Sequence, residues 1–465
     1  MPSFSSVSSA GVKLGAALSL EVTALSPQGT GVAWVEEQPV WIAGALPGDR
    51  IHAVVTRKRP ARVEARLLKL EQPAPNRTLP RCRHFGPCGG CALQHLEYPA
   101  QVDWKRKMLE RIFTQELDLR RLPSLEVFTG DSPWGYRSKM EFTFAQEGDR
   151  VTLGLHQRAS FQRIVDLTDC EIAPPSVNQL LVAVKEAAAL SGLRAYNPKT
   201  HQGFWRYAVV RCSRTTGDLL LLLVTHEGPQ EALEPMARSL PEKVPSLKSL
   251  YWGVSAKVSD VSTPERITFL GGQETLEDQV GGVRFRIGPT QFVQPNLGLA
   301  SKVYEMIRRQ ARLTGQETVY DLYSGGGLIA LSLAREARLV YGVESEQANV
   351  GFAEKNAEIN GISNAVFLWG NLEDLIREQA LFRLSPKPDV VVLDPPRVGL
   401  HAQVCGPLLE ARAPTLLYLS CNPLSLTRDL KILLQRDPGY QVESVQLFDF
   451  FPHTPHSEVL VTLRG

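Results

Sequence analysis

The fold of the C-terminal part follows from one stretch, Thr318-Val319-Tyr320-Asp321-Leu322-Tyr323-Ser324-Gly325-Gly326-Gly327. Its first six residues are apolar enough to form a strand, and the glycines turn the chain into a helix that begins near Leu328. A glycine-rich turn at this place lets the backbone approach a nucleotide-like ligand closely. Glu344 ends the next strand, where an acidic side chain can accept hydrogen bonds from ribose hydroxyls. The pattern of strand, tight turn and helix then repeats, which predicts a doubly wound, Rossmann-like α/β domain.

The glycine-rich turn alone leaves two cofactors open. Gly325, Gly327 and Ala330 satisfy a relaxed G-x-G-x-x-A pattern, which fits either NAD or S-adenosylmethionine. The following strands favour the second cofactor. The apolar run 390–393 leads into the rigid polar corner Asp394-Pro395-Pro396-Arg397 at the sheet edge where open α/β sheets bind ligands. An NAD-dependent oxidoreductase would have no use for this corner or for the cysteine at the next strand end.

That cysteine, Cys421, follows the strand 416–420 and is itself followed by Asn422-Pro423. A lone cysteine is usually a buried small hydrophobic residue, but Asn-Pro marks a turn, so we interpret Cys421 as a nucleophile. Glu458 stands just before the last strand, 459–463. By itself it resembles a surface carboxylate, and it becomes a general base only if the fold brings it to Cys421. The nearby His453 and His456 are compatible with RNA contacts or with turn formation.

The N-terminal part predicts a small β-barrel with a TRAM-like or OB-like architecture, since five short strands and their turns fall within about sixty residues. Barrels of this kind often present one face to an oligonucleotide, although a barrel with only a packing role fits the same pattern. A proline-rich linker, 72–77, and a helix at about 97–119 follow. The expected strands are 18–24, 31–35, 40–42, 51–57 and 63–70.

Three cysteines, Cys82, Cys88 and Cys91, lie within ten residues, next to the flexible pair Gly89-Gly90. Three thiolates need a fourth ligand, and Cys170 is the best candidate because the other cysteines follow strand-like runs or lie in the C-terminal domain. Four sulfur ligands suit either zinc or an iron–sulfur cluster, and the spacing does not decide between them.

Composition and charge exclude several classes of protein. With 465 residues, 43% of them hydrophobic and 22% charged, the chain is neither disordered nor a single ordinary core. No apolar run reaches the length of a membrane span, and no secretory signal is visible, so we expect a cytoplasmic protein. The net charge of +2 hides a basic segment, because residues 50–121 hold 16 Lys or Arg and 7 Asp or Glu. Such a segment is typical of a surface that follows phosphates, or simply of a solvated face.

Taken together, these motifs resemble the RNA uracil-5-methyltransferases over nearly the whole chain, in particular the RumA/RlmD type that acts on 23S ribosomal RNA. The resemblance includes the TRAM-like barrel, the cysteine cluster and the glycine-rich turn. It also includes three further motifs: Phe292-Val293-Gln294-Pro295-Asn296, Asp394-Pro395-Pro396-Arg397 with Ser420-Cys421-Asn422-Pro423, and the loop 452–458. One position departs from the family: several members carry Asn where this chain has Leu328, which has no polar side-chain group to contact the cofactor.

The resemblance implies a role for each candidate residue. Cys421 would be the nucleophile and Glu458 the base in S-adenosylmethionine-dependent methylation of uridine C5. The cofactor would contact Gln294, Tyr323, Glu344, Asn371 and Asp394. A 4Fe-4S cluster would be bound by Cys82, Cys88, Cys91 and Cys170.

The resemblance also implies three domains: a barrel at 11–70, a central α+β domain with the cluster at 71–290, and a methyltransferase domain at 291–465. We expect a monomer whose partner is RNA. The barrel favours 23S rRNA as the substrate, because tRNA-directed bacterial relatives usually lack it. A tRNA uracil-5 enzyme, an RNA cytosine-5 enzyme and a non-catalytic rRNA-binding assembly factor remain as alternatives.

Overall fold

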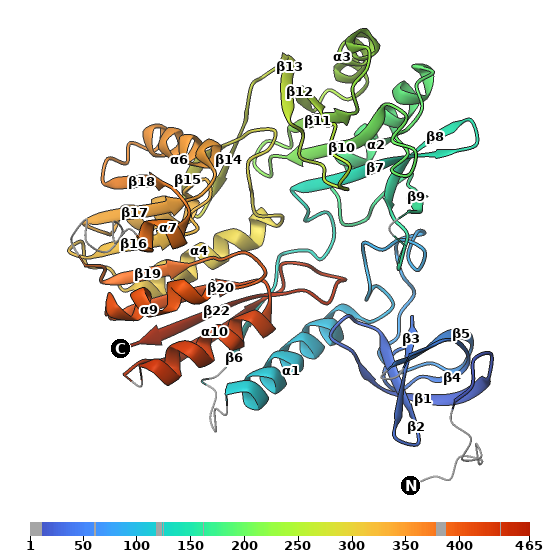
Figure 1. The fold of residues 1–465 in the computed structure, drawn as a ribbon, viewed down its shortest axis with the longest axis horizontal. Helices are drawn as coiled ribbons and strands as arrows, with labels where there is room; N and C mark the ends of the chain where they lie inside the picture. Colours follow the sequence, from blue (N-terminus) through green and yellow to red (C-terminus); the bar gives the residue numbers. More distant parts are fainter. Residues whose placement is uncertain are drawn as a thin grey trace. The chain divides into compact units, whose positions relative to one another are not determined.

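A computed structural model describes residues 12–59, 62–117, 123, 125–160, 162–377, 387–437 and 439–465. The chain divides into two compact units (Figure 1). The first contains the chain up to residue 105 together with 452–455, and the second contains 106–451 together with 456–465. None of the helices in the described ranges is long and apolar enough to cross a membrane. The domain boundaries predicted at residues 70/71 and 290/291 stay predictions.

The first unit begins with a closed five-stranded barrel, drawn in blue in Figure 1. Side chains alternate along its strands, so that residues such as Leu18, Leu20 and Ile42 fill the interior. The barrel predicted from the sequence is therefore confirmed, while its TRAM-like character stays a prediction. Around the barrel, neighbouring strands follow the order β1 (Ala17–Leu25), β2 (Gly31–Val35), β3 (Gln38–Ala43), β5 (Arg62–Gln72) and β4 (Arg50–Arg59), and β4 pairs with β1.

After the barrel, the chain forms a loop-rich segment that leads to helix α1 (Tyr98–Leu117). Residues 452–455, from near the end of the chain, belong to this first unit. The backbone amides of Ala92 and Leu93 both donate to the carbonyl of His453, at 2.8 and 2.9 Å. The side-chain oxygen of Gln101 accepts from the backbone amide of His453 at 2.9 Å. A late segment of the chain is thus built into the unit formed by the earliest one.

The second unit contains a seven-stranded sheet whose inner strands are buried on both faces. Its helices are α2 (Pro175–Leu190), η1 (Gln230–Leu233) and α3 (Glu234–Lys243). Strands β14 (Leu276–Val280) and β15 (Val283–Ile287) form a separate hairpin. The strands of the sheet are, in order, β13 (Arg266–Gly272), β12 (Leu247–Val254), β11 (Leu219–Thr225), β10 (Trp205–Cys212), β7 (Lys139–Glu147), β8 (Arg150–His156) and β9 (Ile164–Asp166).

The same unit holds an eight-stranded sheet with the predicted Rossmann-like order, which confirms the α/β fold class. Five strands run parallel, and the strand order reverses between β16 and β19, where doubly wound sheets bind their ligands. In order, the strands are β18 (Ala365–Trp369), β17 (Leu339–Glu344), β16 (Thr318–Leu322), β19 (Val390–Leu393), β20 (Thr415–Ser420), β22 (Glu458–Arg464), β21 (Gln441–Phe448) and β6 (Leu125–Phe128).

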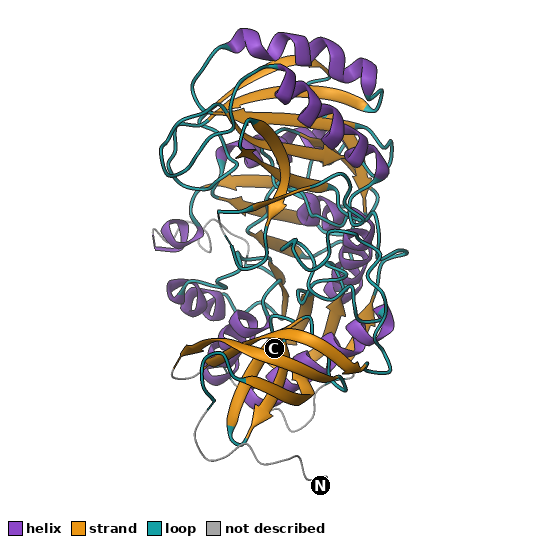
Figure 2. Ribbon diagram, turned by 90° about the vertical axis from the view of Figure 1, so that its right-hand side faces the viewer, coloured by secondary structure: helices purple, strands orange, loops and turns teal. Residues whose placement is uncertain are grey.

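Helices cover the faces of this sheet (Figure 2). Apolar side chains fill the space between them, for example Val319, Val392 and Leu417 on one face and Leu322, Val391 and Tyr418 on the other. Because the parallel strands are buried on both faces, their sequences are continuous apolar runs. The helices are α4 (Leu297–Ala311), α5 (Leu328–Ala334), α6 (Gln347–Ile359), α7 (Leu372–Arg377), α9 (Ala402–Glu410) and α10 (Pro423–Arg436).

Candidate active site

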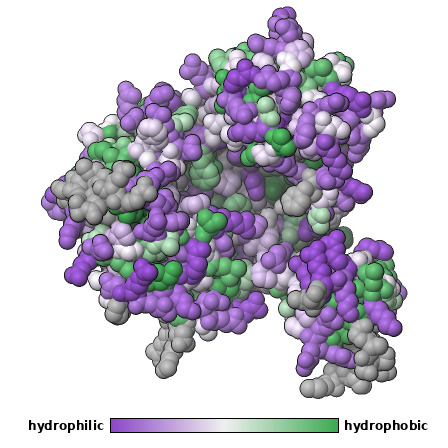
Figure 3. All heavy atoms as spheres, in the orientation of Figure 1, coloured by the Kyte–Doolittle hydropathy of each residue, from purple (hydrophilic) through white to green (hydrophobic). Residues whose placement is uncertain are grey.

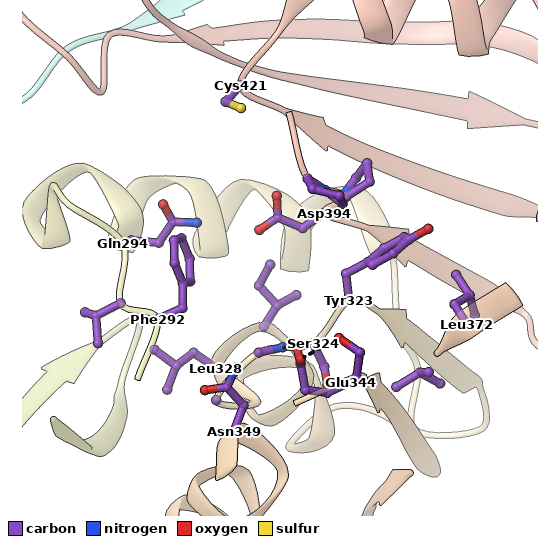
Figure 4. A pocket seen from close by; sticks show the side chains of 18 of the residues that line it. Phe292, Gln294, Tyr323, Ser324, Leu328, Glu344, Asn349, Leu372, Asp394 and Cys421 are labelled. Carbon is purple, nitrogen blue, oxygen red and sulfur yellow. Dashed lines mark hydrogen bonds between the residues drawn. The ribbon is translucent and has the colours of Figure 1, made fainter. Parts of the chain in front are cut away.

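A cavity of about 570 Å³ lies at the carboxyl ends of the parallel strands in the second unit. Its size is that of a typical small-molecule site. Figure 4 shows Cys421 at one end of it, the side chains of Gln294 and Asp394 next, and Ser324, Glu344 and Asn349 toward the other end. All seven residues predicted to act in catalysis or cofactor binding line this one cavity: Gln294, Tyr323, Glu344, Asn371, Asp394, Cys421 and Glu458.

The glycine-rich turn forms one end of the cavity and is held by Glu344. The backbone amide of Gly325 donates to Glu344 Oε2 and that of Glu346 to Oε1, each at 2.8 Å. A carboxylate has about four acceptor positions, so the Glu344 carboxylate can still accept from a ligand. Tyr323, directly before the turn, adopts a left-handed backbone with φ of 71°. This conformation is costly for a non-glycine residue, and such residues are enriched at functional sites.

The turn that carries Cys421 forms the opposite end. Asn422 caps helix α10 by accepting from the amide of Leu424 at 3.2 Å. Its side-chain amide donates to the carbonyl of Arg397 at 3.0 Å, and Ser425 donates to the same carbonyl at 3.1 Å. These bonds connect the end of β20 to the Asp-Pro-Pro-Arg corner that follows β19. The local sequence therefore fixes Cys421 relative to Asp394.

The cavity favours the uncharged forms of its acidic groups. Burial, together with the carboxyl groups of Glu458 and Asp394, raises the pKa of the Cys421 thiol to about 11. Burial raises the pKa of Asp394 to about 7 and that of Glu458 well above its usual range, since Glu458 is only 6% exposed. The guanidinium of Arg397 lowers the pKa of the thiol, but by less than the other causes raise it. A positively charged ligand would lower the pKa values of the three groups and favour their ionisation, and the ionised groups would in turn attract the ligand.

Several residues of the lining were not predicted from the sequence. Ser324, Asn349, Leu372 and Glu373 all reach the cavity. Asn349 lies in the first turn of α6, the helix that follows the acidic end of β17. Its place at the start of this helix could have identified it from the sequence. Leu328, where several family members carry Asn, also lines the cavity, so the departure from the family pattern lies at the site itself.

S-adenosylmethionine, the cofactor implied by the resemblance, fits these residues. The hydroxyl oxygen of Ser324 is buried at the cavity wall and has no hydrogen-bond partner among the described atoms. Such a group is costly to bury unless a ligand or water completes its hydrogen bonding. The turn is also closed to side chains, because a Cβ on Gly327 would lie 2.7 Å from Phe367 Cζ and 2.8 Å from Ala353 Cβ.

The cysteines predicted to bind a cluster are distributed over both units. Cys82, Cys88 and Cys91 belong to the first unit and Cys170 to the second, and the last three are buried. The backbone amide of Gly90 donates to Cys88 Sγ at 3.4 Å. Within the described ranges, no group of three or more His, Cys, Asp or Glu side chains is arranged to hold a metal ion. The predicted 4Fe-4S site therefore stays a prediction.

Comparison with known proteins agrees with the geometry of the cavity. Residues 97–465 match the family model described as tRNA (uracil-5-)-methyltransferase. The chain is 36% identical to an uncharacterized RNA methyltransferase of Geobacter sulfurreducens, over 97% of this chain and 90% of the relative. A second uncharacterized RNA methyltransferase, from Bacteroides thetaiotaomicron, is 32% identical over 95% of this chain and its own full length.

A solved structure extends this likeness to three dimensions. The tRNA (uracil-54, C5)-methyltransferase of Pyrococcus abyssi, in complex with S-adenosyl-L-homocysteine, superimposes with a TM-score of 0.75 at 27% identity. The match covers 96% of this chain and all of the other. Family model, relatives and fold agree with one another, and the chain therefore belongs to the S-adenosylmethionine-dependent RNA uracil-5-methyltransferase family.

Proposed function

We propose that this protein methylates carbon 5 of uridine in RNA through a covalent bond between Cys421 and carbon 6 of the base. One observation carries the proposal: a cysteine and a buried glutamate, Cys421 and Glu458, line the same cavity as the candidate cofactor residues. The two residues are far apart in the sequence, and an amino-group methyltransferase or a binding protein needs neither of them. The pairing matches the nucleophile and base that uracil C5 chemistry requires.

The chemistry needs a nucleophile because carbon 5 of uracil reacts poorly by itself. Addition of the Cys421 thiolate to C6 breaks the C5=C6 double bond and makes C5 electron-rich. When bound, S-adenosylmethionine supplies the electrophilic methyl group and a positive charge. Glu458 then takes the proton from C5, the bond between Cys421 and C6 breaks, and the double bond re-forms. The base must be accessible to these groups, so the target uridine is unpaired or flipped out of its stack.

The residues proposed to hold the cofactor each offer a suitable group. Glu344 offers acceptors for ribose hydroxyls, and the backbone of the glycine-rich turn allows close approach. Gln294, Asn371 and Asp394 add polar groups along the cavity, and Tyr323 adds a ring. Gln294 is anchored through its carbonyl, which accepts from the hydroxyl of Ser138 at 2.7 Å. Positioning of this kind lowers the barrier by placing the reacting atoms in line.

For the substrate we propose 23S rRNA, with tRNA as the second candidate. The N-terminal barrel supports rRNA, because tRNA-directed bacterial relatives usually lack it. The Pyrococcus abyssi structure supports tRNA, since that enzyme is named for tRNA uracil-54 and its fold covers 96% of this chain. An RNA cytosine-5 methyltransferase would also use a cysteine nucleophile. It differs from the rRNA and tRNA uracil enzymes in the base that it methylates.

We also propose a 4Fe-4S cluster bound by Cys82, Cys88, Cys91 and Cys170. Support comes from the three thiols within ten residues, from the Gly90 amide that donates to Cys88 Sγ, and from the family resemblance. No step of the methyl transfer involves it. Purification without oxygen should give about four iron and four sulfide per chain, and removal of Cys88 should lower both. One equivalent of zinc, without sulfide, would show that the metal is wrongly assigned.

The decisive experiment traps the covalent bond. Full-length protein and S-adenosylmethionine are incubated with 5-fluorouridine-containing 23S rRNA or tRNA transcripts, and a denaturant-resistant protein–RNA adduct is measured. Fluorine cannot leave C5 as a proton, so we expect Cys421 to stay attached after methyl transfer, and Cys421→Ala should form no adduct. With ordinary uridine, Glu458→Gln should accumulate the adduct that the wild type resolves.

A matched control is Cys405→Ala, which changes a buried cysteine of the same unit that does not line the cavity. It should form the adduct as the wild type does. An adduct with rRNA alone supports the proposed substrate, and one with tRNA alone supports the second candidate. If protein with its metal intact forms no adduct with either RNA, the uracil mechanism is wrong and the cytosine or non-catalytic interpretation applies.

A further inference from the structure

A second cavity, of about 320 Å³, lies in the second unit and takes no part in the proposed chemistry. We name it the Arg214 cavity. Its walls come from the segment 130–138, the turn after β10 with Arg214, and the first residues of α4. Its volume lies near the lower end of the range for small-molecule sites, which is enough for part of a nucleotide.

The Arg214 cavity is positively charged on one side. A Cβ built on Gly298 would lie 3.2 Å from Arg214 Nε and 3.3 Å from its Cζ, so the guanidinium lies directly against the first turn of α4. Leu297 and Gly298 are the first two residues of this 15-residue helix, and their amides have no acceptor within the helix. A guanidinium beside a helix N-terminus favours a phosphate group.

The turn that carries Arg214 is rigidly held. The carboxylate of Asp278, only 3% exposed, accepts from the backbone amide of Arg214 at 2.6 Å and from that of Thr215 at 3.3 Å. The hydroxyl of Ser213 donates to the carbonyl of Glu277 at 2.8 Å. Among the residues that the structure describes, the guanidinium forms an ion pair with the exposed Asp131 at 3.5 Å, a weak pair that leaves it able to bind an anion.

Aromatic and cationic groups complete the lining. Trp134 and Tyr136 contribute two rings, and Arg137 contributes a second guanidinium. The Nε of Arg137 is buried and donates to no acceptor among the described atoms. Aromatic rings next to arginines are the usual elements that bind the bases and phosphates of single-stranded RNA.

The Arg214 cavity and the active-site cavity share one stretch of chain. Gln294 lines the active-site cavity, while Asn296, Leu297 and Gly298 line the Arg214 cavity. Ser138, also in the lining of the Arg214 cavity, donates through its hydroxyl to the carbonyl of Gln294 at 2.7 Å and through its amide to that of Pro295 at 2.9 Å. A polymer that places one residue in the active site would therefore reach the Arg214 cavity with a residue close to it.

We propose that the Arg214 cavity binds a nucleotide of the RNA that flanks the target uridine, with its phosphate between Arg214 and the N-terminus of α4 and its base against Trp134. The inference rests on the proposed function, because it assumes an RNA substrate. It adds a site that holds the RNA strand in register beside the reacting base, separate from the groups that perform methyl transfer.

The test measures RNA binding by the full chain without cofactor, using fluorescence anisotropy over a range of salt concentrations. The RNA is the stem-loop that forms the 5-fluorouridine adduct. Arg214→Ala should weaken binding about tenfold and should lower the slope of log Kd against log salt by about one. Arg308→Ala is the matched control, since Arg308 is similarly exposed, at 47% against 54%, and pairs with Glu336 at 3.3 Å. It should bind RNA within twofold of the wild type.

Uncharged methylphosphonate groups in the RNA identify the phosphate that Arg214 contacts. Single methylphosphonates at the three positions on each side of the target uridine should weaken binding by the wild type, and one of them should have no further effect on Arg214→Ala. Trp134→Ala should weaken binding, whereas Trp134→Phe should largely restore it. S-adenosylhomocysteine affinity and thermal unfolding of each variant verify that the fold is kept.

Three outcomes overturn the inference while leaving the proposed function intact. In the first, Arg214→Ala binds RNA as Arg308→Ala does. In the second, its effect adds to that of every methylphosphonate, so no single phosphate is its partner. Tight binding of uridine 5′-monophosphate that does not compete with the RNA would likewise assign the cavity to a free anion. If the wild type forms no adduct at all, the proposed function fails instead.

Discussion

At the scale of single residues, the site is a set of acids in an environment that opposes their ionisation. Asp321, in β16, does not line the cavity but lies close to its acids; it is fully buried, and its Oδ2 accepts from the amide of Ala330 at 2.9 Å. Burial and the carboxyl groups of Asp394 and Glu344 raise the pKa of Asp321 to about 8. Functional sites often retain such groups at a cost in stability.

This cost predicts a dependence of stability on pH. The pKa of Asp321 rises from 3.8 in the unfolded chain to about 8, so the folded protein binds a proton that the unfolded chain has lost. Stability from this group is therefore present below about pH 4 and is lost as the pH rises to about 8. Asp321→Asn cannot ionise and should unfold at a higher temperature than the wild type at pH 8.5, with the difference vanishing near pH 4.

Thermal unfolding followed by circular dichroism at both pH values measures the effect. Asp131→Asn, an exposed carboxyl at 76%, serves as the control and should show no such difference. If the unfolding temperatures of Asp321→Asn and the wild type differ equally at both pH values, ionisation of Asp321 is not the cause.

At the scale of elements, the turn between β16 and α5 determines the shape of the cofactor end of the cavity. Gly327 caps α5 with φ of 79° and lies against Phe367 of β18 and Ala353 of α6. The turn is therefore in contact with two neighbouring elements as well as with the cavity. A side chain at this position disturbs both.

Gly327→Ala should lower the free energy of unfolding by at least about 1 kcal/mol, because alanine is strained at positive φ. It should also weaken S-adenosylhomocysteine binding severalfold, because Phe367 and Ala353 must move. The matched control is Gly361→Ala, where φ is 65° but a Cβ would meet nothing within 4 Å. It carries the same backbone strain and should keep its ligand affinity, as measured by calorimetry. Equal affinities of the two variants would refute the steric explanation.

The positions of most strands could be predicted from the sequence. The barrel strands and the strands around the glycine-rich turn were predicted to within about two residues, because local alternation and apolar runs encode them. Two features were missed. Glu458 begins β22 and does not precede it, and β6 joins the edge of the eight-stranded sheet through β21. Both features depend on pairing between segments that are distant in the sequence, and the hydrophobic periodicity within a single segment carries no information about such pairing.

The site could be predicted for a similar reason. Glu344 ends its strand, Asp394 and Cys421 directly follow theirs, and parallel strands bring their carboxyl ends to one edge. Ser324 and Asn349 lie beside such positions but carry no distinctive pattern of their own. The Arg214 cavity had no signal in the sequence, because segments around residues 134, 214 and 298 meet only in the folded chain.

At the scale of the whole molecule, a group of exposed cations lies in a different unit from the active-site cavity. The barrel strands β4 and β5 carry exposed cations, among them Arg57, Lys58 and Arg59, while the active-site cavity lies in the second unit. Hydrophilic side chains predominate on the face shown in Figure 3. We expect the barrel to contribute to RNA affinity without affecting cofactor binding.

Neutralising Arg57 and Arg59 together tests this division of roles. The double variant Arg57→Gln, Arg59→Gln should bind the RNA more weakly at low salt and lower the salt slope by up to about two, while S-adenosylhomocysteine affinity stays unchanged. The control is Arg238→Gln with Lys243→Gln, two exposed cations of α3, and should match the wild type. An unchanged salt slope in the barrel variant would show that its cations are a solvated face.

The capture of residues 452–455 by the first unit has a consequence for biosynthesis. A chain emerging from the ribosome presents its N-terminal segments first, and domains generally fold as they emerge. Here the amides of Ala92 and Leu93 find their acceptor, the carbonyl of His453, only when some 360 further residues have been made. The barrel can close early, but the cysteine-bearing loop beside it stays incomplete until residue 455 has left the ribosome. The part of this loop that holds Ala92 and Leu93 is therefore completed only after most of the methyltransferase sheet has been synthesised.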